Sequence, residues 1–415
     1  MTKAAVETTI TNEQVEKIDS FKELLAIKDY RFLILGQLVS MLGDGVYTLA
    51  LVWTMKVLTG SAVYISIVLA AEIIPVIIFG IFAGVLVDRG NPKKYMLIAD
   101  LMRGFVILSV FVLLLVGHLS PWMLIVSAVV TSSFDAFFSP AKTVSIRAIV
   151  PDHLMTRAQS LSATIQTVVG LVAPAIAAIL LAFHLPTAFL FNAITFFLSF
   201  LFILFIRQAS LPKQSTEKLD VKTFTTDLKT GLKTIISVPL LRGMIIYLVL
   251  INFMLAPVSV LFPLFVEDAS QLAAVQIFFA VGILIGALAI NLFSKYKKII
   301  PMIVGLSLLL AAFAALAFIE NYVIILSLVL CAGFGSVLAS ISLQTVFITK
   351  VPREFLGRSQ STMRVLLESS RPLALLLTGS LLVYFSISSL FLGIAIFGGL
   401  VVLLMILNPA IRKAE

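Results

Sequence analysis

The chain has few charged residues and a single cysteine, and both features limit the classes of protein to which it can belong. Only 12% of its 415 residues are charged and 60% are hydrophobic, whereas about a quarter of the residues of a soluble domain are charged. Cys331 has no second cysteine with which to form an intrachain disulfide. The first 30 residues are polar and lack the apolar core of a signal peptide. The composition therefore places the chain in a lipid bilayer.

Motifs of the common catalytic classes are missing from the sequence as well. It has no Walker A pattern and no arrangement of a nucleophile with a partner base. The three histidines, His118, His153 and His184, lie near loops without the spacing of metal ligands. We therefore expect no enzyme, no ATP hydrolysis by that route, no metal site and no cofactor.

Long apolar runs with brief polar breaks fill most of the chain. A helix needs about 20 apolar residues to cross a bilayer, and lipid admits only helices and closed barrels. The alternation with a period of two that a barrel requires is missing. The sequence predicts an all-α integral membrane protein with twelve spans, at 31–57, 62–87, 95–116, 121–143, 155–182, 187–206, 241–266, 271–294, 299–318, 322–348, 355–384 and 387–407.

The net charge of +9 is distributed unevenly among the loops. Lys and Arg gather in every second loop, and the turns between these loops carry none. The basic loops cover 89–94, 142–157, 295–298 and 350–358. This positive-inside bias predicts a multi-pass protein of the cytoplasmic membrane with both termini in the cytoplasm. The charge therefore indicates orientation in a lipid bilayer rather than a nucleic-acid partner.

One long polar stretch, 207–240, separates two sets of six spans. Its apolar residues at helical spacing favour a segment that lies on the membrane surface, and a helix that docks a partner is the alternative. These residues are Val221, Phe224, Leu228, Leu232 and Ile235. The predicted organisation is a cytoplasmic N-terminal segment (1–30), a six-helix half (31–206), a cytoplasmic linker (207–240), a second six-helix half (241–407) and a cytoplasmic tail (408–415).

The two halves are weakly similar at an offset near 200 residues. The segment from Val150 to Ser160 matches the segment from Val351 to Ser361. Gly80-xxx-Gly84 matches Gly282-xxx-Gly286, and each pair precedes a basic loop. Many secondary transporters are built from such repeats, with the substrate bound between them at the bilayer midplane. The repeat predicts two pseudo-symmetric halves.

The loop after the second span carries the most informative motif. Gly80-xxx-Gly84 is a small-residue stripe that allows another helix to approach closely, and the run from Gly84 to Lys94 contains Asp88, Arg89 and Lys93. In this order the residues resemble the loop 2–3 signature of the major facilitator superfamily. The chain departs from that signature at two positions, Asn91 and Pro92.

The resemblance to this superfamily implies a transporter with a conformational switch. It implies that Asp88 docks on the start of span eleven, that Arg89 and Lys93 are supporting loop charges, and that Gly80 and Gly84 allow the close approach. A solvated surface carboxylate is the alternative for Asp88.

Span five carries a second, looser motif. Gly170, Ala173 and Pro174 resemble the antiporter motif of drug exporters, although Ala stands at three of its glycine positions. An Ala-rich packing face explains the same residues equally well.

Nearly the whole chain resembles the twelve-span drug:proton antiporter branch, which includes macrolide-efflux and enterobactin-exporter relatives. The resemblance is carried by Gly36-Gln37 through Gly43-Asp44, the loop 84–94, 138–141 leading to Val150-Pro151, and 157–161. It implies a monomer that exports a small amphiphilic substrate by alternating access, exchanges it for protons and confers antibiotic resistance.

Charges inside spans are costly and therefore indicate function. Asp44, Glu72 and Asp135 lie within spans one, two and four, and we expect them to bind the proton or the substrate. A poorly hydrated carboxyl binds a proton more readily than a hydrated one, and a cationic substrate competes with that proton.

Other polar residues inside spans suggest pairing or cavity walls. Asp100 and Arg103 are spaced for pairing on one helix face, as are Arg364, Glu368 and Arg371. Glu368 and Arg371 are also deep enough to face a cavity. Asn192 and Asn252 are further candidates for lining it.

Two other functions are alternatives to drug export. One is an exporter or flippase for an endogenous molecule such as a siderophore or a lysolipid. The other is a membrane sensor or scaffold without transport. A long partner-binding domain would favour the sensor, and the sequence contains none.

Overall fold

The computed structural model describes residues 21–207, 211, 230, 232–237, 239–293, 295–297, 299–351 and 356–408. Within these residues the chain forms helices and no strands. The main helices are α2 (Lys28–Thr59), α3 (Ala62–Arg89), α4 (Pro92–Leu115), α5 (Pro121–Ile149), α6 (Met155–Phe183), α7 (Pro186–Leu204), α9 (Pro239–Leu255), α10 (Val258–Phe265), α11 (Ala269–Ala289), α12 (Ile299–Leu316), α13 (Tyr322–Lys350), α14 (Leu356–Leu381) and α15 (Ile387–Leu407), with 3-10 turns η1 (Asp152–Leu154) and η3 (Ile290–Phe293).

Eleven helices in the described part are long and apolar enough to cross a membrane. The remaining predicted span, 355–384, is helix α14, which carries Arg364, Glu368 and Arg371 and is therefore more polar. The predicted all-helical membrane fold is confirmed.

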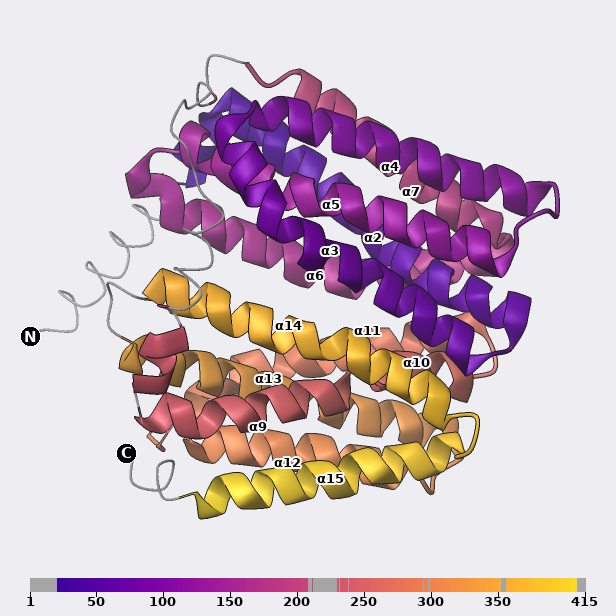
Figure 1. Cartoon of the computed structure of the whole chain (residues 1–415), viewed down its shortest axis with the longest axis vertical. Coiled ribbons are helices and arrows are strands. Elements are labelled where there is room, and N and C mark those ends of the chain that lie inside the picture. The colour runs from indigo at the N-terminus through magenta and orange to yellow at the C-terminus, as the bar shows by residue number, and fades with distance from the viewer. Residues whose placement is uncertain are drawn as a thin grey trace, which may run out of the picture.

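Two groups of helices make up the bundle (Figure 1), α2 to α7 in one and α9 to α15 in the other. In the first group, α2 packs against α6 and α7, α3 against α5, and α4 against α5 and α7. In the second, α13 packs against α11 and α12, and α15 against α12. Between the groups, α3 packs on α14 and α6 packs on α11. These two pairs, with smaller contacts of α10 on α2 and α3, connect the halves.

The start of α4 explains why the basic loop departs from the superfamily signature. The Asn91 side-chain oxygen accepts hydrogen bonds from the backbone N–H groups of Lys93 (3.0 Å) and Lys94 (3.4 Å). Pro92 occupies the first helical turn, where its missing N–H costs nothing. Asn91 and Pro92 together therefore begin the helix as an N-cap pair.

The seventh predicted span, 241–266, is not one continuous helix. It is divided into α9 and α10 at Ala256 and Pro257, because proline has no N–H to continue the ladder and its ring crowds the preceding turn. The break lies beside Asn252, whose carbonyl still accepts from the Ala256 N–H at 3.2 Å.

The linker prediction falls mostly outside the described residues, which include only 211, 230 and 232–237 between 208 and 238. Residues 232–237 are helical, and Ile235 is fully buried in a cluster that contains Met302 and Leu306. This side chain packs into the protein and does not lie on the membrane surface.

The two matching glycine pairs have different surroundings. A Cβ atom at Gly282 would overlap the Leu330 carbonyl oxygen, and one at Gly286 would meet Phe334 and Val337, so α11 and α13 touch through their backbones. Among the described residues, a Cβ atom at Gly80 or Gly84 would have no neighbour within 4 Å. The described residues therefore show the close approach at the second pair, and the approach at the first pair stays a prediction.

We predict that Gly282→Ala lowers the midpoint of thermal unfolding in detergent, because the added methyl group overpacks the α11–α13 contact at a cost of about 1–3 kcal/mol. Gly399→Ala is the matched control. Its Cβ would meet nothing within 4 Å, and its better helix propensity favours the folded state by up to about 1 kcal/mol. Equal midpoints for the two variants would contradict the contact.

Candidate functional site

A cavity of about 190 Å³ lies among four helices of the first half. Its acidic lining residues are Asp44 of α2, Glu72 of α3 and Asp135 of α5, and Arg103 of α4 supplies the opposite charge. The other lining residues are Tyr47, Thr48, Val76, Ala128, Thr131 and Ser132. The structure thus brings together three carboxyl groups that the sequence places on three separate spans.

Arg103 contacts charged and aromatic side chains from three helices around this cavity. Its guanidinium donates to Asp100 at 2.5 Å and to Asp135 at 3.2 Å, and its side chain is only 2% exposed. The rings of Phe138 and Phe196 lie 4.6 and 4.4 Å from it, which adds cation–π attraction. The pairing of Asp100 with Arg103 is confirmed. The bond to Asp135 was not predicted, since helix spacing reveals only neighbours on the same helix.

Negative charge exceeds positive charge around the cavity. Three carboxyl groups face one guanidinium, and Asp100 already occupies part of that guanidinium. Lys142 of α5 is near enough to interact electrostatically with Asp44 and Asp135. The Thr131 hydroxyl is buried and has no hydrogen-bond partner among the described residues. This arrangement favours a bound cation or bound protons, because either would offset the excess charge.

A second cavity of about 520 Å³ lies between the two halves. Its walls are mostly apolar, with Leu49, Val52, Leu69, Phe262, Leu272, Val275 and Phe279 among them. Asn252, Gln276 and Arg371 are polar groups on the same walls. Thr48 lines both cavities. An apolar chamber and an acidic chamber therefore adjoin at one residue of α2.

The residues of the motif predicted in span five have two roles, since one lines a cavity and the others pack between helices. Gly170 lines the larger cavity and has open space where a Cβ would stand. Ala173 and Pro174 are buried, and a Cβ at Gly45 of α2 would lie 2.6 Å from the Ala173 methyl group. Ala173 is thus a packing contact between α2 and α6, which agrees with the packing alternative at that position.

Two cavity candidates do not line either chamber. Asn192 is fully buried and its side-chain oxygen lies where a Cβ of Gly43 would stand, so it packs between α7 and α2. Asn192 thus contacts a neighbouring helix, because a polar residue inside a span can also join two helices, and its role in lining a cavity stays a prediction. Glu368 pairs with Arg371 at 3.0 Å and is not among the lining residues.

The residues of the predicted switch are only partly described. The backbone of Asp88 belongs to α3, but its side chain and the start of span eleven at 352–355 lie outside the described residues. The docking of Asp88 therefore stays a prediction, and so does the role of Arg89, at the end of α3. Lys93 donates to the carbonyls of Leu204 (2.9 Å) and Ile206 (2.6 Å). This lysine therefore caps the end of α7.

We predict that Arg103→Met destabilises the protein by about 3–5 kcal/mol, because Asp100, which is not exposed, loses its counter-ion. The double variant Arg103→Met with Asp100→Leu should recover most of that loss, as measured by thermal unfolding. Arg371→Met is the control, since its ion pair is 38–40% exposed and is worth at most about 1 kcal/mol. A double variant no more stable than Arg103→Met would contradict the pairing.

Comparison with known proteins agrees with this arrangement. A model of the Major Facilitator Superfamily matches residues 33–374. Macrolide efflux protein A of Streptococcus pyogenes is 26% identical over 392 residues, which cover 91% of this chain and 94% of that protein. Multidrug efflux pump Tap of Mycolicibacterium fortuitum is 26% identical over 400 residues, which cover 92% of this chain and 96% of that pump.

A solved structure supports the fold. A bacterial homolog of the human lysosomal transporter Spinster, in an inward-facing and unoccupied conformation, has a TM-score of 0.69. It is 13% identical, and the match covers 93% of this chain and 97% of that one. The resemblance to the drug-efflux branch is confirmed by the relatives named above. The matched region spans most of the sequence, and the chain belongs to the Major Facilitator Superfamily.

Proposed function

We propose that this transporter exports amphiphilic compounds of the multidrug or macrolide type in exchange for protons. One observation carries the proposal: the acidic cavity within the first half adjoins the apolar cavity between the halves at Thr48. An amphiphile needs both environments, since its apolar body gains about 25 cal/mol per Å² on leaving water and its charged group needs a counter-ion.

Competition between the proton and the substrate for the same carboxyl groups couples proton entry to substrate export. Asp44 and Glu72 line the acidic cavity with no ion pair to Arg103 among the described contacts. A cationic substrate stabilises their charged form, and protonation removes the attraction for that substrate. Proton binding from one side of the membrane therefore displaces the drug. The membrane potential adds about 2.3 kcal/mol per charge moved for each 100 mV.

The contacts between the halves support alternating access. At the end of the bundle where α2 terminates at Gly60, Ser66 of α3 packs on Gly379 of α14. At the other end, near the basic loops, positions Gly80 and Gly84 of α3 have no neighbour within 4 Å of a Cβ among the described residues. We assign the open end to the cytoplasm because the basic loops lie there.

Asp44→Asn and Glu72→Gln should each reduce proton-driven efflux at least about tenfold while the protein inserts normally, because a neutral amide cannot exchange a proton. The assay is macrolide and dye accumulation in cells, with and without an uncoupler. Glu267→Gln is the control, an exposed carboxyl outside both cavities. Unchanged efflux in both cavity variants would remove these residues as coupling sites.

Asp88→Asn should abolish cycling without affecting insertion, because the neutral side chain loses its attraction for the positive end of span eleven. Asp152→Asn is matched to it, since Asp152 is an exposed carboxyl in η1, beside the basic end of α5. Transport that survives Asp88→Asn at the level of Asp152→Asn would show that Asp88 is a solvated surface group.

Export or flipping of an endogenous lysolipid or siderophore is the competing function. Arg371 on the wall of the larger cavity favours it, because a guanidinium attracts anionic head groups. Binding of a lysolipid by the purified protein, with no competition from macrolides, would support this function against drug export.

A further inference from the structure

Lys56 is a basic residue at the end of the bundle where basic residues are scarce. It lies in the last turn of α2, close to turn 59–61, which carries no Lys or Arg. The orientation argument gives no reason for a lysine there, since positive charge gathers at the opposite loops. Its contacts supply one.

The ammonium group of Lys56 crosses from the first half to the second. Its Nζ donates to the carbonyl oxygen of Val266 at 2.6 Å, across 210 positions of sequence. Val266 is the C-cap residue of α10, so this oxygen lies at the negative end of a helix. The same Nζ lies 4.4 Å from the centre of the Trp53 ring. A cation held by a carbonyl and by an aromatic face has a defined position.

The receiving loop is itself ordered by hydrogen bonds. Asp268 caps α11 by accepting from the Gln271 N–H at 2.8 Å, and it also accepts from the Ser270 hydroxyl at 2.6 Å. These two bonds hold the pKa of Asp268 below its ordinary value, so the carboxylate stays charged at neutral pH and attracts Lys56. The Glu267 N–H donates to the Gln271 side chain at 3.0 Å. The Val266 carbonyl is therefore presented by a fixed loop.

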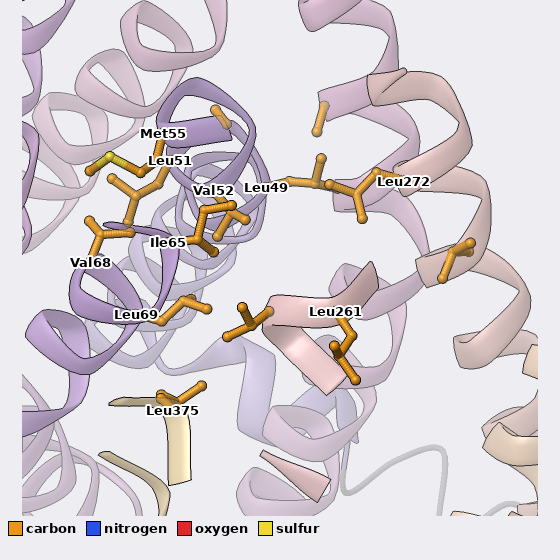
Figure 2. Packing of buried hydrophobic residues seen from close by; sticks show 14 of the residues in the cluster. Leu49, Leu51, Val52, Met55, Ile65, Val68, Leu69, Leu261, Leu272 and Leu375 are labelled. Atoms are coloured by element: carbon orange, nitrogen blue, oxygen red, sulfur yellow. The ribbon is translucent and has the colours of Figure 1, made fainter. Parts of the chain in front are cut away.

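Buried leucine and valine side chains from both halves meet on the inner side of Lys56, and we call them the apolar seal. Figure 2 shows Leu49 and Leu272 pointing toward one another, and Leu261 and Leu375 of the second half belong to the same buried cluster. Val52 and Leu69 complete it. Val52 precedes Lys56 by four residues, so both occupy one face of α2. The lysine thus lies one turn beyond the seal.

We propose that the Lys56–Val266 contact holds the two halves closed at this end of the transporter and must break before the cavity can open there. Apolar contact is not directional, so the seal alone fixes neither the register of α2 against α10 nor a single closed state. The hydrogen bond fixes both. The inference rests on the alternating access of the proposed function and makes Lys56 a positioning residue for it.

Lys56→Met tests this contact, because methionine keeps an apolar stem over Trp53 and loses the donor. Spin labels at His118→Cys and Glu320→Cys, in a Cys331→Ala background, report the distance between the halves at this end, since both positions are exposed in loops there. In nanodiscs without substrate, Lys56→Met should raise the ratio of open to closed distances about tenfold, as expected for a charge-assisted hydrogen bond. Lys56→Arg should keep the original distribution, because a guanidinium still donates.

Glu267→Gln is the control for charge alone, because this exposed carboxyl lies next to Val266. An unchanged distribution in Lys56→Met, or an equal shift in Glu267→Gln, would overturn the proposal.

If Lys56→Met does not insert, Asp268→Ser takes its place, since serine keeps the cap on α11 and removes the attracting charge. That variant should shift the ratio in the same direction, and no shift would count against the contact. The distances need neither drug nor proton gradient, so failed efflux would count against the proposed function only.

Discussion

Arg103 carries a full charge into a bundle where 2% of its side chain is exposed, and lipid offers nothing to solvate it. An ion taken out of water costs several kcal/mol unless partners replace its hydration. Asp100, Asp135 and two aromatic rings are those partners. Their geometry fixes how α4, α5 and α7 stand around the acidic cavity. The arrangement is therefore a structural requirement before it is a functional one.

The same network leaves the cavity with a negative excess. Asp100 and Asp135 both bind Arg103, whereas Asp44 and Glu72 line the same cavity with no ion pair to that guanidinium among the described contacts. A buried excess of charge is unstable unless something mobile offsets it, and protons and cationic groups are the mobile species that a transporter meets. The carboxyl groups of α2 and α3 are therefore the ones that the proposed function uses to bind a proton or a cationic group. Thr48 lines both this acidic cavity and the apolar cavity between the halves.

Apolar length and loop charge were sufficient to predict the helices, because a span of about 20 apolar residues has few alternatives in lipid. The same reasoning failed where a contact depends on distant residues. Pro257 divides one predicted span into two helices, Asn192 joins α7 to α2, and Arg103 reaches Asp135 across 32 positions. Hydropathy does not reveal which face of a helix meets which neighbour. The sequence predicted the three acidic site candidates because a carboxyl inside a span is costly and therefore indicates function. Only the structure shows that the three side chains line one cavity.

The glycine pairs show how one repeat can serve two purposes. In the second half, Gly282 and Gly286 lie against the backbone of α13, within one half, where close packing makes a rigid unit. In the first half, Gly80 and Gly84 meet no described atom within 4 Å of a Cβ, and α3 is the helix that packs on α14 across the interface. In the proposed alternating access, rotation of the halves would change the surroundings of the first pair, whereas the second pair keeps one contact within its half. Ile290 stands at the position of Asp88 in the second repeat, and a contact within one half requires no acidic switch.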